Sequence, residues 1–111
     1  MTEQLPLKEE ELAWAGETLK RAEEKLKKVS GRSAHKIPYT TVDGVHDDRS
    51  GDDQIDWWTN GFWGGMMWQL YALTQDEEYM IIAVETEEKM DRNLMCAEGL
   101  THDNGFKWLL T

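Results

Sequence analysis

Four of the six tryptophans of this 111-residue chain fall within the fourteen residues from Ile55 to Trp68. Indole rings stack on the C–H faces of sugar rings, and neighbouring polar side chains can bind the sugar hydroxyls. Asp56, Thr59 and Asn60 provide such neighbours here. The segment is therefore a candidate carbohydrate cleft. Composition alone also allows a tryptophan-rich core helix, because aromatic residues at helical spacing usually pack against other elements.

A second polar motif, which runs from Thr101 to Phe106 and contains His102 and Asp103, follows about forty residues later. The intervening residues have a helical pattern, and the motif itself interrupts that pattern. A carboxylate at such a point can do chemistry in a cleft. It can equally be the N-cap of the helix that follows, which is a common place for aspartate.

Together the two motifs resemble a known family. Trp-Thr-Asn-Gly-Phe-Trp at positions 58 to 63, with His-Asp-x-Gly-Phe at 102 to 106, is similar to the N-terminal part of the unsaturated glucuronyl hydrolases, glycoside hydrolase family 88. The resemblance runs from about Leu12 to Thr111. The chain departs from the family pattern at Gly64, where proline or threonine is usual, and at Asn104, where an aliphatic residue is usual. Neither change removes a group that does chemistry.

The resemblance implies an all-α fold. Proteins of this family form an (α/α)6 barrel of six helical hairpins, and 111 residues correspond to about two of them. We therefore expect residues 1–111 to be a partial glycoside hydrolase domain, the N-terminal segment of such a barrel. Since the sequence stops at Trp108-Leu109-Leu110-Thr111, just as a helix begins, we expect it to be truncated at its C-terminus.

The implied reaction is the hydration of a 4,5-unsaturated uronic acid at the non-reducing end of an oligosaccharide, the product of polysaccharide lyases. Asp103 matches the carboxylate that stabilises the developing positive charge. A second aspartate, the proton donor, lies beyond Thr111 in the family pattern. We therefore expect the chain alone to be catalytically silent. The resemblance implies no cofactor and no metal.

The resemblance also implies substrate-binding residues. Either Trp58 or Trp63 would stack on the sugar, Asn60 would be a hydrogen-bonding neighbour, and His102 would contact the substrate carboxylate or orient Asp103. Two alternatives stay open for the whole chain. One is the sister family of unsaturated rhamnogalacturonyl hydrolases, and the other is a small, complete, non-catalytic helical domain that binds carbohydrate or another protein.

The composition limits the kinds of molecule that the protein is expected to bind. A net charge of −10 argues against nucleic acid and anionic membranes, because few basic groups can neutralise phosphates. The single cysteine, Cys96, excludes an internal disulfide within the chain. The N-terminus has no apolar leader, and no apolar run reaches the length of about 18 residues that a membrane span needs. We expect a cytoplasmic protein whose partner is an oligosaccharide.

Periodicity predicts helices from Pro6 to Lys28, from Thr59 or Asn60 to Thr74, and from Glu77 to about Met95, with a restart at Phe106. Thr59 or Asn60 would cap the second helix. The third is expected to bury Ile81, Val84 and its methionines. Residues 34–55 read as one long loop, and Gly64 and Gly65 suggest either a close approach of another backbone or a fluid N-terminal turn of the helix.

Two expectations concern the surface. The aspartates from Asp47 to Asp53 lack the ligand spacing of a calcium loop, and His35 and His46 lack a second ligand at zinc spacing, so we expect no metal site and exposed histidines. We also expect several apolar side chains to lack partner helices and to promote self-association. These are Phe62, Trp63, Met67, Trp68, Met80, Ile81 and Trp108.

Overall fold

The computed structural model describes residues 6–96 and 103–111, and within these ranges the chain is all-α apart from one small hairpin, as predicted. It divides into two compact units, Met1–Gly31 and Arg32–Thr111. The helices are α1 (Glu9–Arg32), α2 (Asn60–Thr74), α3 (Glu77–Cys96) and α4 (Asn104–Trp108), and the strands are β1 (Thr41–Val42) and β2 (Val45–His46). None of these helices is long and apolar enough to cross a membrane.

Helix α1 accounts for the described part of the first unit and ends at Arg32, four residues later than predicted. Three glutamates occupy its first turn, where the helix dipole favours negative charge. Ser30 does not end the helix, because its hydroxyl donates back to the carbonyl oxygen of Lys27 at 3.1 Å. Leu12 and Leu19, on the apolar stripe, are 55% and 45% exposed.

The long loop expected between the first two helices contains a two-stranded antiparallel hairpin. Thr41 pairs with His46, and Val42 pairs with Val45. The turn between them is Asp43-Gly44, with φ angles of 51° and 78°. Two positive φ angles are what a tight hairpin turn requires, and Asp-Gly is one of the strongest sequence signals for it. The prediction of an unbroken loop from 34 to 55 was therefore wrong at this point.

Two adjacent aspartates after the hairpin bind the backbone of the segment before it. Asp47 accepts hydrogen bonds from the backbone N–H groups of Tyr39 and Thr40, both at 2.8 Å, and Asp48 accepts from the N–H of Ile37 at 3.1 Å. Burial alone would raise the pKa of Asp47, but these bonds and the Arg49 guanidinium outweigh it, so its pKa lies below the ordinary value. These carboxylates hold the loop together.

Arg49 fixes the loop to the segment that precedes α2. Its guanidinium lies over the rings of Tyr39 and Trp57, 4.8 and 5.0 Å from their centroids. The two rings also contact each other edge to face, with centroids 5.1 Å apart. Stacking of a cation on two aromatic rings gives a stiff contact. The start of α2, and with it Trp58, is thereby held in place.

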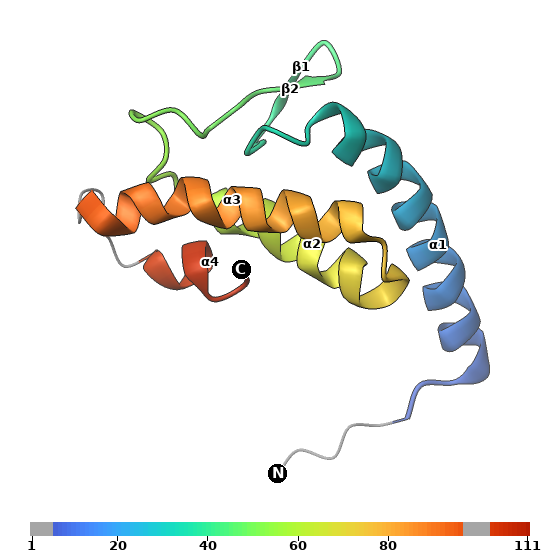
Figure 1. The fold of residues 1–111 in the computed structure, drawn as a ribbon. Helices are drawn as coiled ribbons and strands as arrows, with labels where there is room; N and C mark the ends of the chain where they lie inside the picture. The colour runs from blue at the N-terminus through green and yellow to red at the C-terminus, as the bar shows by residue number, and fades with distance from the viewer. Residues whose placement is uncertain (1–5, 97–102) are drawn as a thin grey trace. The chain divides into compact units, whose positions relative to one another are not determined.

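Helices α2 and α3 form an antiparallel hairpin, seen side by side in Figure 1. Gln75 ends α2 in the left-handed conformation, with φ 58°, and its N–H donates to the carbonyl oxygen of Tyr71. Across the hairpin, Trp68 Nε1 donates to Glu87 Oε1 at 2.8 Å. The buried apolar side chains of the two helices are Trp63, Met67, Leu70, Tyr79, Ile82, Ala83 and Met90.

The prediction for the buried side of α3 was right for Met90, which is 1% exposed, but wrong for Ile81 and Val84. Ile81 is 60% exposed and Val84 is 39% exposed, whereas Tyr79, Ile82 and Ala83 are buried. The buried face also includes polar residues: Thr86, whose hydroxyl donates to the carbonyl oxygen of Ile82, and Asn93. Because polar residues continue the buried face along the helix, the apolar pattern alone favours a neighbouring face.

The short helix α4 packs on the N-terminal half of α2, where three glycines make room for it. A Cβ atom at Gly61 would lie 2.0 Å from the carbonyl oxygen of Lys107, and one at Gly65 would lie 2.8 Å from Leu110 Cβ. A Cβ at Gly64 would lie 3.1 Å from the Thr111 side chain. The close backbone approach predicted for Gly64 and Gly65 is therefore confirmed at Gly65, where the Leu110 carbonyl oxygen would lie 3.0 Å from a Cβ, but at Gly64 the near atoms belong to side chains. The expected exposure of Trp63 and Met67 was wrong, since they are 3% and 0% exposed.

Candidate functional site

Three aromatic side chains from the two sequence motifs meet at the junction of α2 and α4. Trp58 precedes α2, Phe62 lies in its first turn, and Phe106 lies in α4. Their ring centroids are 5.9 to 6.1 Å apart in each of the three pairings, with the rings tilted or edge to face. We call Trp58, Phe62 and Phe106 the aromatic cluster. Trp58 and Phe106 are 41% and 49% exposed, so part of each ring is open to a ligand.

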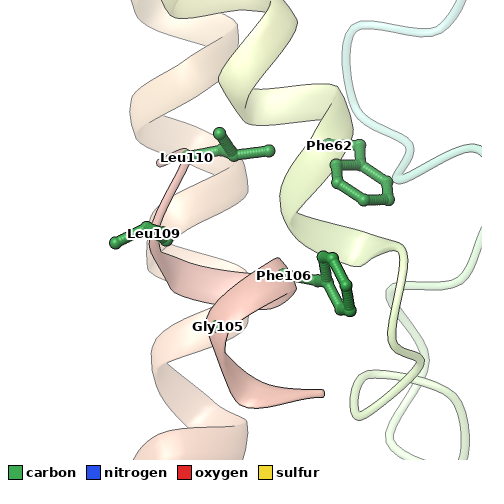
Figure 2. Close-up of a pocket in the computed structure, with 5 residues that line it drawn as sticks. All are labelled: Phe62, Gly105, Phe106, Leu109 and Leu110. Atoms are coloured by element: carbon green, nitrogen blue, oxygen red, sulfur yellow. The ribbon is translucent and has the colours of Figure 1, made fainter. Parts of the chain in front are cut away.

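An open apolar hollow of about 460 Å³ adjoins the aromatic cluster. Phe62 and Phe106 form part of its lining, and Figure 2 shows the two rings facing the same space from α2 and α4. Gly105, Leu109 and Leu110 complete the lining. The hollow can therefore accept an apolar surface, and any hydrogen bonds to a sugar must come from its surroundings.

Asp103 stands at the N-cap position of α4, but its side chain makes no capping hydrogen bond. Its backbone carbonyl oxygen accepts from the N–H of Phe106 at 3.0 Å, so the carboxylate and the aromatic cluster share one turn. Asp103 is half-buried. Asp103 thus occupies the position that the N-cap interpretation requires, but without the side-chain hydrogen bond of an ordinary cap. His102, the adjacent predicted site residue, lies outside the described residues.

Of the two tryptophans that could stack on a sugar, only Trp58 presents much of its ring. Trp63 is 3% exposed and has its ring edge to face with that of His46, at a centroid distance of 6.1 Å. Its Nε1 is buried and has no hydrogen-bond partner. The position of Trp63 supports a packing role, whereas that of Trp58 is open to a ligand.

Asn60, the predicted hydrogen-bonding neighbour, lies in the interior at 1% exposure. Its Nδ2 donates to the carbonyl oxygens of Arg49, Gln54 and Ile55, at 3.3, 3.2 and 3.0 Å. The amide nitrogen therefore holds the preceding turn against α2, whereas Asn60 Oδ1 is buried with no hydrogen-bond partner among the described residues. Its contact with a substrate stays a prediction. Thr59 is the N-cap residue of α2, one of the two positions predicted, but its hydroxyl makes no capping hydrogen bond.

Lys107 is a buried cation that sequence reasoning did not identify. It is 0% exposed, and its Nζ donates to the backbone oxygen of Asp56 and to Asn93 Oδ1, both at 3.3 Å. Burial lowers the pKa of Lys107, and the charges of Asp56 and Asp103 partly offset that effect. The sequence does carry one signal, because Asp103 and Lys107 are four residues apart and so share a helical face.

His35 and His46 make contacts of a structural kind. His46 Nδ1 bonds to the buried Ser33 hydroxyl at 2.8 Å, so this histidine is not simply a surface residue, whereas His35 is exposed and pairs with Glu85 at 2.9 Å. Within the described ranges, no group of three or more histidine, cysteine, aspartate or glutamate side chains is arranged to hold a metal ion.

The chain is similar to one characterised protein over part of its length. It is 41% identical over 61 residues to the unsaturated glucuronyl hydrolase of Bacillus sp. (strain GL1). The matched residues are 54% of this chain and 16% of that protein, so the chain corresponds to a small part of its relative. No family model matches the chain. No solved structure matches it with significance.

Proposed function

We propose that this chain carries part of the active site of a glycoside hydrolase that acts on oligosaccharides ending in a 4,5-unsaturated uronic acid. The observation that supports this most is the meeting of the two motifs. Phe106, on the same turn as Asp103, packs against Trp58 at a centroid distance of 5.9 Å. A carboxylate and an open indole on adjoining elements are what a sugar-hydrating site needs, and the partial similarity to an unsaturated glucuronyl hydrolase agrees with it.

In the proposed reaction an acid donates a proton to the alkene carbon C4 of the unsaturated ring. Positive charge then develops on C5 and the ring oxygen. A water oxygen bonds to C5 and loses a proton, and the resulting hemiketal opens and releases the next sugar. The role we propose for the Asp103 carboxylate is to stabilise the positive charge, an effect that is typically worth a few kcal/mol when the group is preorganised.

The ring that reacts would lie on the open face of Trp58, with Phe106 beside it. Stacking of a planar ring on an aromatic platform contributes about 1–3 kcal/mol in nucleic-acid complexes, and we expect a similar contribution here. The proton donor is a separate group, because a carboxylate that must stay charged cannot also deliver the proton at the same moment. Within this proposal Asp103 alone does not complete the reaction.

Binding of an unsaturated glucuronyl disaccharide to the 111-residue chain tests the proposal directly. We expect quenching of tryptophan fluorescence that saturates, and a loss of affinity in Trp58→Ala. The matched control is Trp14→Ala, which removes a tryptophan that is 68% exposed on α1, and it should bind as the wild type does. Circular dichroism verifies that both variants are folded. Equal affinity in Trp58→Ala and the wild type, or no binding at millimolar sugar, would overturn the proposal.

Two parallel assays separate the alternatives. An unsaturated rhamnogalacturonyl disaccharide that binds more tightly than the glucuronyl compound would move the substrate to the sister family. Loss of the ultraviolet absorbance of the conjugated enol ether reports turnover, which we expect to be absent for this chain. The apolar hollow beside the aromatic cluster favours a non-catalytic helical domain as the second candidate, and binding without dependence on Trp58 would support it.

A further inference from the structure

The feature that the proposed function leaves unused is the buried ammonium of Lys107. Removing a lysine from water is costly, and such groups are retained where acceptors and negative charge surround them. Lys107 is 0% exposed, and it reaches two segments other than its own helix. It donates to Asn93 Oδ1 on α3 and to the backbone oxygen of Asp56 in the turn before α2, each at 3.3 Å.

These contacts converge on the element that carries Asp103. Helix α4 has five residues, too few to be stable by itself, so its position depends on what it binds. Its backbone lies against Gly61, where even a methyl group would collide with the carbonyl oxygen of Lys107. The Lys107 side chain then ties the same turn to α3. Lys107 therefore fixes the position of α4 in two ways. Its backbone packs against α2, and its side chain binds α3.

We propose that Lys107 is the positioning residue for Asp103: its buried ammonium holds the short helix α4 in place and keeps a positive charge on the helical face that Asp103 shares. The inference rests on the proposed function, in which Asp103 stabilises positive charge in the reaction. Asp103 and Lys107 are four residues apart, which places them on one face of the helix. A lysine in this position offsets the cost of holding a carboxylate in a half-buried site at the start of α4.

The first test measures whether the two charges interact, without any sugar. The Lys107 side chain is followed by NMR as a function of pH in the 111-residue chain, in Asp103→Asn and in Asp43→Asn. In Asp103→Asn we expect the Lys107 titration to move to lower pH, because a neighbouring negative charge that favours the ammonium is gone. Asp43→Asn is the control. It removes the same charge from the exposed hairpin turn, where asparagine tolerates the positive φ, and the titration should not move.

The second test asks whether Lys107 positions Asp103. In Lys107→Met, which keeps the length of the side chain but removes the charge, we expect the Asp103 carboxyl carbon signal to shift at neutral pH. Lys107→Arg should restore most of the wild-type signal. A merely structural tie would leave the Lys107 titration unchanged in Asp103→Asn, and that result would overturn the proposal even if Lys107→Met fails to fold. An Asp103 signal that is the same in Lys107→Met and the wild type would also overturn it.

Failure of this inference and failure of the proposed function give different results. Neither NMR measurement involves a ligand, so an unchanged titration removes the role of Lys107 and leaves sugar binding to be judged by Trp58→Ala. If instead the two charges are coupled but the disaccharide does not bind, the positioning of Asp103 by Lys107 stands as a structural fact about α4, and the glycosidase proposal falls.

Discussion

At the scale of single residues, the proposed chemistry requires a specific property of the half-buried Asp103. A carboxylate that stabilises positive charge should discriminate between cationic and anionic ligands. It stands at the N-cap position of α4, and its side chain makes no capping hydrogen bond there. This property can be measured in the isolated chain, because it concerns binding and does not require turnover.

We expect Asp103→Asn to weaken the binding of a cationic iminosugar by about tenfold, since a hydrogen bond to a charged group contributes about 1.5–3 kcal/mol. The unsaturated disaccharide is itself an anion and should not bind more weakly to this variant. Calorimetric titration of both ligands against wild type and Asp103→Asn provides the comparison. A parallel loss for both ligands would indicate a change of fold and would speak against a charge-specific role.

Glu85 gives a prediction about pH. The hydrogen bond from His35, at 2.9 Å, is the main cause of its lowered pKa, and Lys89, at 3.2 Å, adds to it. A carboxylate whose folded-state pKa is lowered stabilises the fold above its ordinary value of 4.5, and loses that effect as the pH falls through the folded pKa. Glu85 is partly exposed, so we expect a contribution of only about 0.2–1 kcal/mol.

The measurement is urea unfolding of wild type and Glu85→Gln at pH 7 and in acid. The two proteins should differ at pH 7 and converge as Glu85 becomes protonated. Glu88→Gln, an exposed position on the same helix, should match the wild type at both pH values. High salt should also reduce the difference at pH 7, because exposed ion pairs are screened.

At the scale of elements, the glycines of α2 determine where α4 can lie. In Gly61→Ala the new methyl group would lie 2.0 Å from the Lys107 carbonyl oxygen, so α4 must move away from α2. We expect a loss of several kcal/mol in the free energy of unfolding, beyond the 1–3 kcal/mol typical of overpacking by flexible side chains, because the collision is with backbone. Changes in the NMR signals of residues 104–108 would locate the disturbance.

Gly105→Ala is the matched control for that experiment. Gly105 lies inside α4, and a Cβ atom there would have nothing within 4 Å. Since alanine is the better helix former, this variant should be as stable as the wild type or more stable, by about 0.5–1 kcal/mol. If both alanine variants behaved alike, the close approach of α4 to Gly61 would not exist in solution.

The elements also show how far sequence reasoning reaches. The predicted bounds of α2 and α3 agree with the structure to within a residue, because Gln75-Asp76 separates two continuous helical patterns. The sequence analysis missed the β-hairpin although Asp43-Gly44 is a typical hairpin turn. Strands of only two residues are too short to show an alternating pattern. The face of α3 was misassigned because Thr86 and Asn93 are polar residues that are buried.

The candidate site was predictable only in part, for a related reason. Trp58 and Asp103 could be selected from motif chemistry, since each is a residue type that can act on a sugar. Phe62, Phe106 and Lys107 could not, because their roles arise from contacts between segments about fifty residues apart. Such contacts depend on Gly61, because a residue with a side chain at this position would collide with α4. The burial of Asn60 and Trp63 likewise follows from packing and not from residue type.

At the scale of the whole molecule, the chain combines exposed apolar side chains with a net charge of −10. Leu109 is 85% exposed and lines the apolar hollow with Leu110, which is 45% exposed. Apolar surface of this kind promotes association, while like charge opposes it at low ionic strength. The balance between these two effects predicts an association that depends on salt.

We expect sedimentation velocity to show mostly monomer at low salt and a larger species at about 0.5 M salt, where charge repulsion is screened over a few ångströms. Leu109→Glu should remove most of the salt-induced association. Val42→Glu is the control, because Val42 is 69% exposed on the hairpin and does not line the hollow. If the protein stayed monomeric at all salt concentrations, the hollow would not mediate self-association.

The contact between Gly61 and the Lys107 carbonyl oxygen has a consequence for comparing sequences. Because Gly61 of α2 packs against the main chain of α4, this contact does not depend on which side chains residues 106 and 107 carry. It is intolerant only of bulk at position 61. Residue 61 is therefore a diagnostic character: a sequence that keeps both motifs but has a larger residue at this position must hold its His-Asp segment elsewhere. Glycine at this position, more than the tryptophans around it, marks the chains that can place the carboxylate as this one does.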